Sequence, residues 1–134
     1  MDVHAMISAH PDVRGNTNKQ LVHAIEEMLN CGEVCTSCAD ACLAEEMVAQ
    51  LRQCIRLNLD CADICFATAR VATRRAGGNV EVIASLLTAC IEACRRCGDE
   101  CERHAREMEM EHCRICAEAC RRCEQACEAA LGSL

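Results

Sequence analysis

The sequence has almost no aromatic residues: one Phe, no Trp and no Tyr occur among its 134 residues. Aromatic side chains normally supply much of the buried area of a protein core. An interior without them has to be built from Cys, Ala and a modest number of Leu, Ile, Val and Met. The sixteen cysteines therefore take positions where larger hydrophobic residues would pack better, and we infer that something other than packing selects them.

The sequence also lacks a basic block, and its net charge at pH 7 is −7. Proteins that follow a phosphate backbone carry clustered Lys and Arg with aromatic residues between them, so we expect no nucleic-acid partner. No stretch approaches roughly 18 uninterrupted apolar residues, and the N-terminus has no charged segment followed by an apolar core. These features predict neither a membrane span nor a secretion signal, and hence a soluble, cytoplasmic protein with reduced thiols.

The cysteines fall into four runs in which neighbours are three, four or seven residues apart. Such spacings return to one face of an α-helix, which repeats every 3.6 residues. Each run therefore predicts a stripe of thiols along one helix, and four stripes that face one another would line a tube with sulfur. The runs are Cys31, Cys35, Cys38 and Cys42; Cys54, Cys61 and Cys65; Cys90, Cys94, Cys97 and Cys101; and Cys113, Cys116, Cys120, Cys123 and Cys127.

The pattern predicts an all-α fold, an antiparallel up-down-up-down four-helix bundle that forms a single domain over residues 1–134. A short N-terminal helical segment within residues 1–16 should end before Pro11, and the pair Gly77-Gly78 should end the second long helix. We expect the long helices at about residues 17–45, 49–76, 79–109 and 112–131.

Two of the three turns between the long helices contain neither Gly nor Pro, and the phase of the stripes locates them instead. The first and second cysteine runs are separated by 12 residues, as are the third and fourth. A continuous helix would rotate the stripe by about 120° over that distance, so that consecutive stripes would point apart. Short turns are therefore predicted near residues 45–48 and 109–111, which lie at the same end of the bundle.

Helix capping and a hydrophobic plug complete the predicted fold. Thr17 followed by Gln20 matches a capping box for the first long helix, and Asn79 can cap the third. At the end away from the turns at 45–48 and 109–111, the helix seams carry apolar residues instead of cysteine. The residues expected in this plug are Leu21, Ile25, Ala72, Val80, Ile83, Leu87 and Leu131.

A soft metal explains so many thiols better than packing or disulfide formation does. Cu(I) is soft and singly charged, binds two or three thiolates, and allows a thiolate to bridge two ions. If each ion takes two sulfurs and each sulfur serves two ions, the chain would hold about 16 Cu(I) ions, whose charge would cancel that of the thiolates. The alternatives are a zinc or general soft-metal buffer, which needs closed four-ligand sites, and an iron–sulfur electron carrier.

Three further residues on the seams are candidate ligands. His104 and Met108 continue the third cysteine stripe, at the end where the sulfur tube should meet solvent and where weaker ligands suit a gate through which ions pass. Asn58 interrupts the second stripe; its amide oxygen would bind copper or make a hydrogen bond inside the bundle. Other residues near the same end, among them His112 and Met110, are equally well explained as ordinary bundle-end residues.

An outward apolar stripe on the second helix predicts a partner surface. Leu59 and Phe66 are seven residues apart on a helix whose other outward positions carry charged residues. An exposed apolar stripe on such a surface favours self-association, so we expect a homo-oligomer.

The whole pattern resembles a known family, the cysteine-rich four-helix-bundle copper storage proteins, and specifically their cytosolic branch. The resemblance rests on the repeated Cys-x3-Cys and Cys-x2-Cys units, the stretch CIRLNLDCADIC at 54–65 and MISAHP at 6–11. It implies a homotetramer whose core stores many Cu(I) ions, with metal entering at the polar end. It assigns storage to the sixteen cysteines and an accessory ligand role to His104 and Asn58, and it implies that the protein is not an enzyme.

Overall fold

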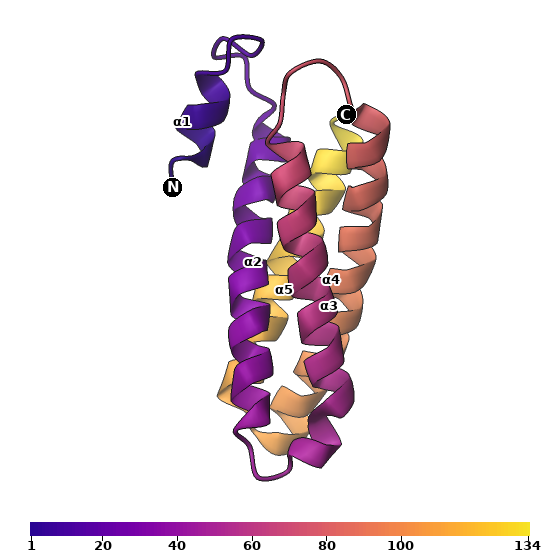
Figure 1. Ribbon diagram of the computed structural model, residues 1–134. Coiled ribbons are helices and arrows are strands. Elements are labelled where there is room, and N and C mark those ends of the chain that lie inside the picture. Colours follow the sequence, from indigo (N-terminus) through magenta and orange to yellow (C-terminus); the bar gives the residue numbers. More distant parts are fainter.

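The cysteine runs and the apolar residues beside them form four long α-helices in the computed structural model, which describes all 134 residues (Figure 1). Each long helix packs against two others: α2 and α4 both contact α3 and α5. This arrangement confirms the predicted antiparallel four-helix bundle. The elements are α1 (Val3–Ser8), α2 (Lys19–Leu43), the 3-10 helix η1 (Val48–Leu51), α3 (Arg52–Ala72), α4 (Val80–Met108) and α5 (Glu111–Gly132). None of these helices combines the length and hydrophobicity needed to span a bilayer.

The connections between the helices lie at two ends of the bundle. Residues 44–47 with η1 join α2 to α3, and Glu109 and Met110 join α4 to α5, at the lower end in Figure 1. Glu109 ends α4 with a left-handed backbone conformation, φ 55°, which reverses the chain within two residues. The loop 73–79 and both termini of the bundle lie at the other end, so the turns are where the phase of the cysteine stripes placed them.

Three local details differ from the sequence prediction. Asn79 takes the N-cap position of α4, as predicted, but its side chain makes no capping hydrogen bond. Asn18, not Thr17, caps α2: its side chain accepts a hydrogen bond from the Leu21 backbone N–H at 3.0 Å. Asn18 has the better capping side chain and also donates to Ser133 Oγ at 2.9 Å, which ties the start of α2 to the end of α5. The helix α3 ends at Ala72, four residues earlier than predicted, because Thr73 and Arg74 are exposed and offer no apolar side chain to the core.

The bundle interior has two parts, an apolar end and a long cysteine-lined section. Leu21, Ile25, Met28, Ile83 and Leu87 are all buried at the apolar end, near loop 73–79. Two residues expected there are less buried. Val80 is 45% exposed, because it is the first residue of α4 and lies beside the glycine loop, and Leu131 is half-buried.

Candidate metal centre

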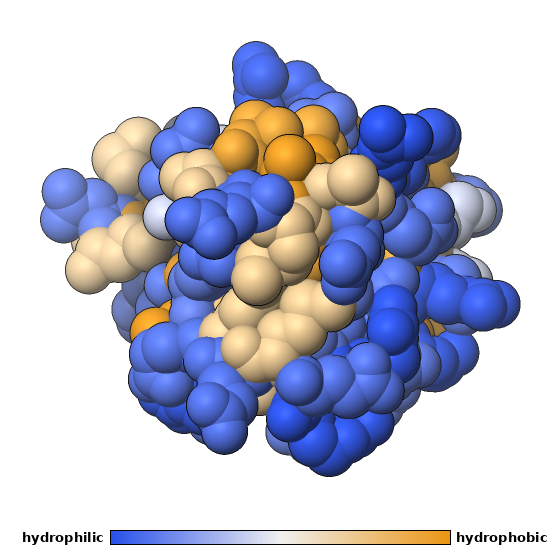
Figure 2. Space-filling view, turned by 90° about the horizontal axis from the view of Figure 1, so that it is seen from below, coloured by the Kyte–Doolittle hydropathy of each residue, from blue (hydrophilic) through white to orange (hydrophobic).

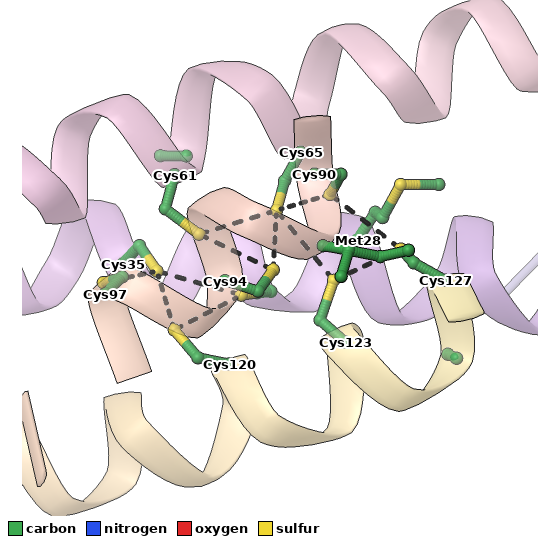
Figure 3. Close-up of a cluster of buried hydrophobic side chains, with 14 of the residues drawn as sticks. Met28, Cys35, Cys61, Cys65, Cys90, Cys94, Cys97, Cys120, Cys123 and Cys127 are labelled. Carbon is green, nitrogen blue, oxygen red and sulfur yellow. Dashed lines mark hydrogen bonds between the residues drawn. The ribbon is translucent and has the colours of Figure 1, made fainter. Parts of the chain in front are cut away.

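All sixteen cysteines point into the bundle and carry free thiols. The most exposed of them, Cys38, has 2% of its surface accessible, and fourteen have none. Figure 3 shows thiols from all four long helices converging on one interior space. Helical periodicity therefore aligns the thiols within each helix, and bundle packing brings the four stripes together.

The sulfur atoms form a continuous array. Cys65 illustrates the spacing: its Sγ lies 3.6 Å from that of Cys90 and 3.9 Å from those of Cys61, Cys94 and Cys123. On the other side of the core, the Sγ atom of Cys35 is 3.7–4.0 Å from sulfur atoms on α2, α4 and α5. Neighbouring thiolates at these separations can bind the same ion.

The thiols are shared between overlapping groups. Four sets of four cysteines have ligand atoms that all lie within 4.8 Å of one another, and several cysteines belong to two sets. Structural zinc sites use four ligands that close around one ion and are not shared. Overlapping sets instead suit ions of low coordination number that are bridged by thiolates. The sets are Cys31/Cys61/Cys65/Cys94, Cys31/Cys35/Cys61/Cys120, Cys35/Cys97/Cys116/Cys120 and Cys65/Cys90/Cys94/Cys123.

The local environment shifts the thiol pKa values in both directions. The pKa of Cys35 is raised above that of an ordinary thiol, first by its hydrogen bond with Cys116 and also by burial, which penalises the thiolate. The pKa of Cys38 is lowered to about 5, because Cys101 and Cys113 hydrogen-bond to its thiolate. A metal cation that replaces the thiol protons removes the cost of burying negative charge.

Asn58 is fully buried in the gap of the second cysteine stripe. Its Oδ1 accepts hydrogen bonds from the thiols of Cys97 at 3.0 Å, Cys101 at 3.4 Å and Cys116 at 3.5 Å. Its Nδ2 lies 3.9 Å from the Sγ atom of Cys54. The amide oxygen is therefore surrounded by sulfur from two other helices, at a position from which it could bind an ion that displaces a thiol proton.

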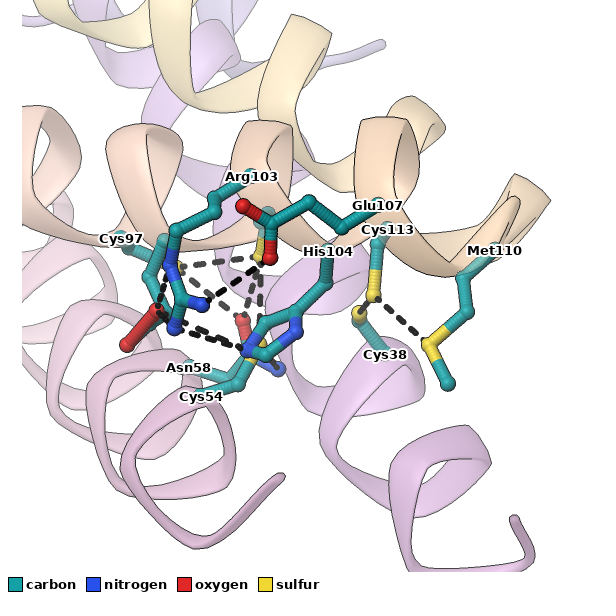
Figure 4. Close-up of polar contacts among 11 residues, drawn as sticks. Cys38, Cys54, Asn58, Cys97, Arg103, His104, Glu107, Met110 and Cys113 are labelled. Carbon is teal, nitrogen blue, oxygen red and sulfur yellow. Dashed lines mark hydrogen bonds and ion pairs between the residues drawn. The ribbon is translucent and has the colours of Figure 1, made fainter. Parts of the chain in front are cut away.

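His104 is buried at the end of the sulfur array, with 1% of its surface accessible. Figure 4 shows it beside Asn58 and Cys54. Its Nε2 lies 3.5 Å from Oε1 of Glu100 and from Nη2 of Arg103, whereas its Nδ1 is buried without a hydrogen-bond partner. An unpaired buried ring nitrogen on the helix face that carries the α4 thiols is available to a metal ion. Met108, one turn further along α4, is partly buried against the core.

Two residues that the cysteine periodicity does not select as ligands lie against thiols in the structure. His112 Nδ1 lies 3.4 Å from the Sγ atom of Cys38 and 3.6 Å from that of Cys113. Met110 Sδ lies 3.9 Å from the Sγ atom of Cys113 (Figure 4). Met110 belongs to the reversal between α4 and α5, where helical periodicity gives no direction for a side chain, and His112 lies in the first turn of α5, beside the cysteine stripe and not on it. Their position next to Cys113 in the sequence was the only available signal.

The turn end of the bundle is closed over the sulfur array. Leu51 is fully buried there and Met110 is 6% exposed. Figure 2 looks onto this end and shows apolar side chains crossing its centre, surrounded by polar ones. Leu43 and Met47, in and beside the α2–α3 connection, are exposed apolar residues. The thiols at this end therefore lie beneath an apolar cover.

Comparison with known proteins identifies one family. The family model described as copper storage protein matches residues 17–132. The chain is similar to the copper storage protein Ccsp from Streptomyces lividans loaded with 10 copper equivalents, with 49% identity over 98% of this chain and 99% of that one and a TM-score of 0.92. It is also similar to a cytosolic copper storage protein from the same organism with five coppers, at 52% identity over 87% of this chain and 95% of that one, TM-score 0.83. No curated protein matches the chain.

Proposed function

The chain belongs to the copper storage protein family, and from that premise we propose that it stores many Cu(I) ions in the cytosol on the thiolates that line its core. The observation that carries the proposal is the continuous array of buried, free thiols on all four long helices. The protein binds and releases ions and performs no catalytic step. The similar Streptomyces lividans proteins are described as loaded with ten and with five coppers, which supports several ions per chain here.

Charge balance favours Cu(I) over divalent ions in this core. A thiolate that bridges two Cu(I) ions, each held by two sulfurs, gives equal numbers of ions and thiolates and a neutral interior. Divalent ions at four-thiolate sites would leave each site negatively charged inside an apolar environment, which is costly. The expected capacity is therefore about 16 ions per chain, with about one proton released for each ion bound.

All sixteen cysteines are proposed as storage ligands, and three other side chains as accessory ligands. Asn58 would contribute its amide oxygen where the second cysteine stripe is interrupted. His104 would contribute Nδ1, which has no partner in the buried end of the array. Met108 would act as a weaker thioether ligand beyond His104, or as a side chain that limits access to it.

An anaerobic Cu(I) titration against a competing chromophoric chelator tests the proposal. We expect tight uptake that continues to about one ion per thiol. Saturation at about four ions would indicate tetrathiolate sites of the zinc type instead. The absorption spectrum of the protein separates the remaining alternative, because Cu(I) is d¹⁰ and its complexes here should be colourless, whereas iron–sulfur proteins are brown.

We also propose that the protein forms a homotetramer through the face of α3 that carries Leu59 and Phe66. Leu59 is 45% exposed, and Ile55, on the same helix, is partly exposed. Phe66 contributes less free surface than a solvent-facing residue would, because its ring packs over Gly32 of α2. Sedimentation or light scattering of the wild-type protein measures the oligomeric state directly.

A further inference from the structure

The innermost part of the sulfur array, next to the apolar end of the bundle, lacks a thiol from one of the four long helices. The four-thiol set at this end consists of Cys65 on α3, Cys90 and Cys94 on α4, and Cys123 on α5. This set has no member from α2, although the neighbouring set includes Cys31 of that helix. The last thiol of α2 therefore lies one step short of the last thiols of the other three helices.

Met28 is the residue of α2 at this level of the core. It precedes Cys31 by three residues and Cys35 by seven, so it lies on the helix face that carries those thiols. The helices α2 and α5 run antiparallel, and the Sγ atom of Cys31 lies 3.9 Å from that of Cys120. One step back along α2 corresponds to one step forward along α5, which places Met28 opposite Cys123.

The Met28 side chain extends into the core and not towards solvent. None of its surface is accessible, and it belongs to the same buried cluster as the cysteines. Figure 3 shows it at the end of the array, near Cys90 and Cys127. A thioether sulfur is a soft donor that suits Cu(I), as a thiolate is. At this end of the array, α2 therefore supplies a thioether where the other three helices supply thiols.

The seam residue that follows the last cysteine towards the apolar end differs between the four long helices. All four of these residues are fully buried. Only the one on α2 carries a soft donor, because the Leu and Ala side chains have no donor atom. The hydroxyl group of the Thr on α3 is a hard donor, and it donates its hydrogen to the backbone carbonyl of Ile64 at 2.7 Å. The four residues are Met28, Thr68, Leu87 and Ala130.

The thiol of Cys127 has fewer sulfur partners than a thiol in the middle of the array. Its Sγ atom hydrogen-bonds with the thiols of Cys90 at 3.9 Å and Cys123 at 4.0 Å, whereas that of Cys65 hydrogen-bonds with four thiols. Both partners of Cys127 also belong to the four-thiol set with Cys65, so an ion bound to Cys127 has few thiolates to itself. A thioether would add a third ligand there without adding negative charge to the interior.

We propose that Met28 is a ligand of the innermost Cu(I) ion, which it binds together with the thiolates of Cys90 and Cys127. The inference rests on the proposed storage function, and it adds a ligand at the end of the array opposite to His104 and Met108. Since the thioether is neutral, the balance of one Cu(I) ion for each thiolate is unchanged. The buried methionine thus serves the metal core as well as the packing of the apolar end.

X-ray absorption at the selenium edge tests the assignment. The protein is prepared with selenomethionine as the variant Met108→Leu/Met110→Leu, which removes the thioethers at the other end of the array, and is loaded with Cu(I). Four of the six methionines remain, and three of these, Met1, Met6 and Met47, are exposed. We expect copper scattering around selenium with about one quarter of the amplitude for fully bound selenium, because one selenium atom in four would bind copper.

Two further changes show whether Met28 gives the signal. Adding Met28→Leu should abolish the copper scattering and preserve the fold, because Leu and Met have similar volumes; circular dichroism checks the fold. Adding Leu21→Met as well returns a buried selenium to the same seam, about 10 Å further from the thiols, and should give no copper scattering. In a chelator titration, Met28→Leu alone should lower the affinity for one ion by about tenfold or more, since even a residue that only orients a metal ligand typically contributes about 10–100-fold.

The outcomes distinguish this inference from the function on which it rests. Cu(I) uptake with no copper around selenium in the Met108→Leu/Met110→Leu protein would overturn the role of Met28 and leave storage intact. Copper scattering that is unchanged by Met28→Leu, or that returns with Leu21→Met, would do the same. A wild-type protein that takes up no Cu(I) would instead refute storage itself.

Discussion

Replacing Gly32 by Ala tests how closely α2 and α3 pack where the Phe66 ring covers Gly32. A Cβ atom added at Gly32 would lie 2.7 Å from two ring atoms of Phe66 and 2.9 Å from a third. Carbon atoms in proteins do not approach so closely, and an aromatic ring cannot yield by rotating a flexible end. The Gly32→Ala variant must therefore push α3 away from α2 or force the Phe66 ring out of its position.

The expected effect is the sum of two opposing terms. In an unobstructed helix, Ala is more stable than Gly by about 0.8–1.0 kcal/mol, whereas overpacking a well-filled contact costs about 1–3 kcal/mol. We therefore expect Gly32→Ala to lower the free energy of unfolding by up to about 2 kcal/mol. Denaturant unfolding of the reduced, metal-free protein, followed by circular dichroism, measures this change.

A double-mutant cycle isolates the contact with the ring. In a Phe66→Ala background nothing obstructs the new methyl group, so Gly32→Ala should stabilise the protein by about 1 kcal/mol. The coupling energy between the two sites would then be about 1–3 kcal/mol. Gly132→Ala is a useful control, because no atom lies within 4 Å of the added Cβ at that position. The reasoning is refuted if Gly32→Ala stabilises the protein equally in both backgrounds.

Three other changes give defined expectations. Replacing one cysteine of each long helix by Ser should lower the Cu(I) capacity by about four ions. An unchanged endpoint in the chelator titration would contradict bridging of ions by shared thiolates. Leu59→Glu should shift the sedimenting species towards the monomer if α3 forms the oligomer interface, while Gln53→Glu, at an exposed position of α3 on another face, is the charge-matched control. An unaltered mass for both would place the interface elsewhere. Asn18→Ala should lower the free energy of unfolding by about 1 kcal/mol. Asn79→Ala, at a cap position where the side chain makes no hydrogen bond, should lower it by less. Equal losses would show that the capping hydrogen bond of Asn18 adds no stability. The cysteines chosen for replacement by Ser in the first experiment are Cys38, Cys61, Cys97 and Cys120.

The sequence was sufficient to predict the bundle and the orientation of its cysteines. Spacings of three and four residues define one face of a helix regardless of the neighbouring helices. Where a continuous helix would turn the next cysteine run to another face over 12 residues, a turn is also predicted even though the segment contains neither Gly nor Pro. Cys65 and its neighbours lie where this reasoning placed them because the regular helix, and no longer-range interaction, determines their direction.

The remaining features depend on contacts between helices, which periodicity does not describe. His112 lies against Cys38 only because the left-handed residue Glu109 turns α5 towards α2. Phe66 was predicted to face outward, but a glycine on the adjacent helix leaves a hollow into which its ring fits. Neither the angle of a two-residue reversal nor the hollow opposite a glycine can be obtained from the spacing of residues within one segment.

The apolar end of the bundle has a consequence for how the protein behaves without its cargo. Leu21, Ile25 and Leu87 pack there without any cysteine between them, so hydrophobic burial at that end does not require an ion. Zinc fingers, by contrast, unfold when their metal is removed. The metal-free protein should therefore keep the folded bundle. A cell could then hold the unloaded form in reserve and load it with ions without a refolding step.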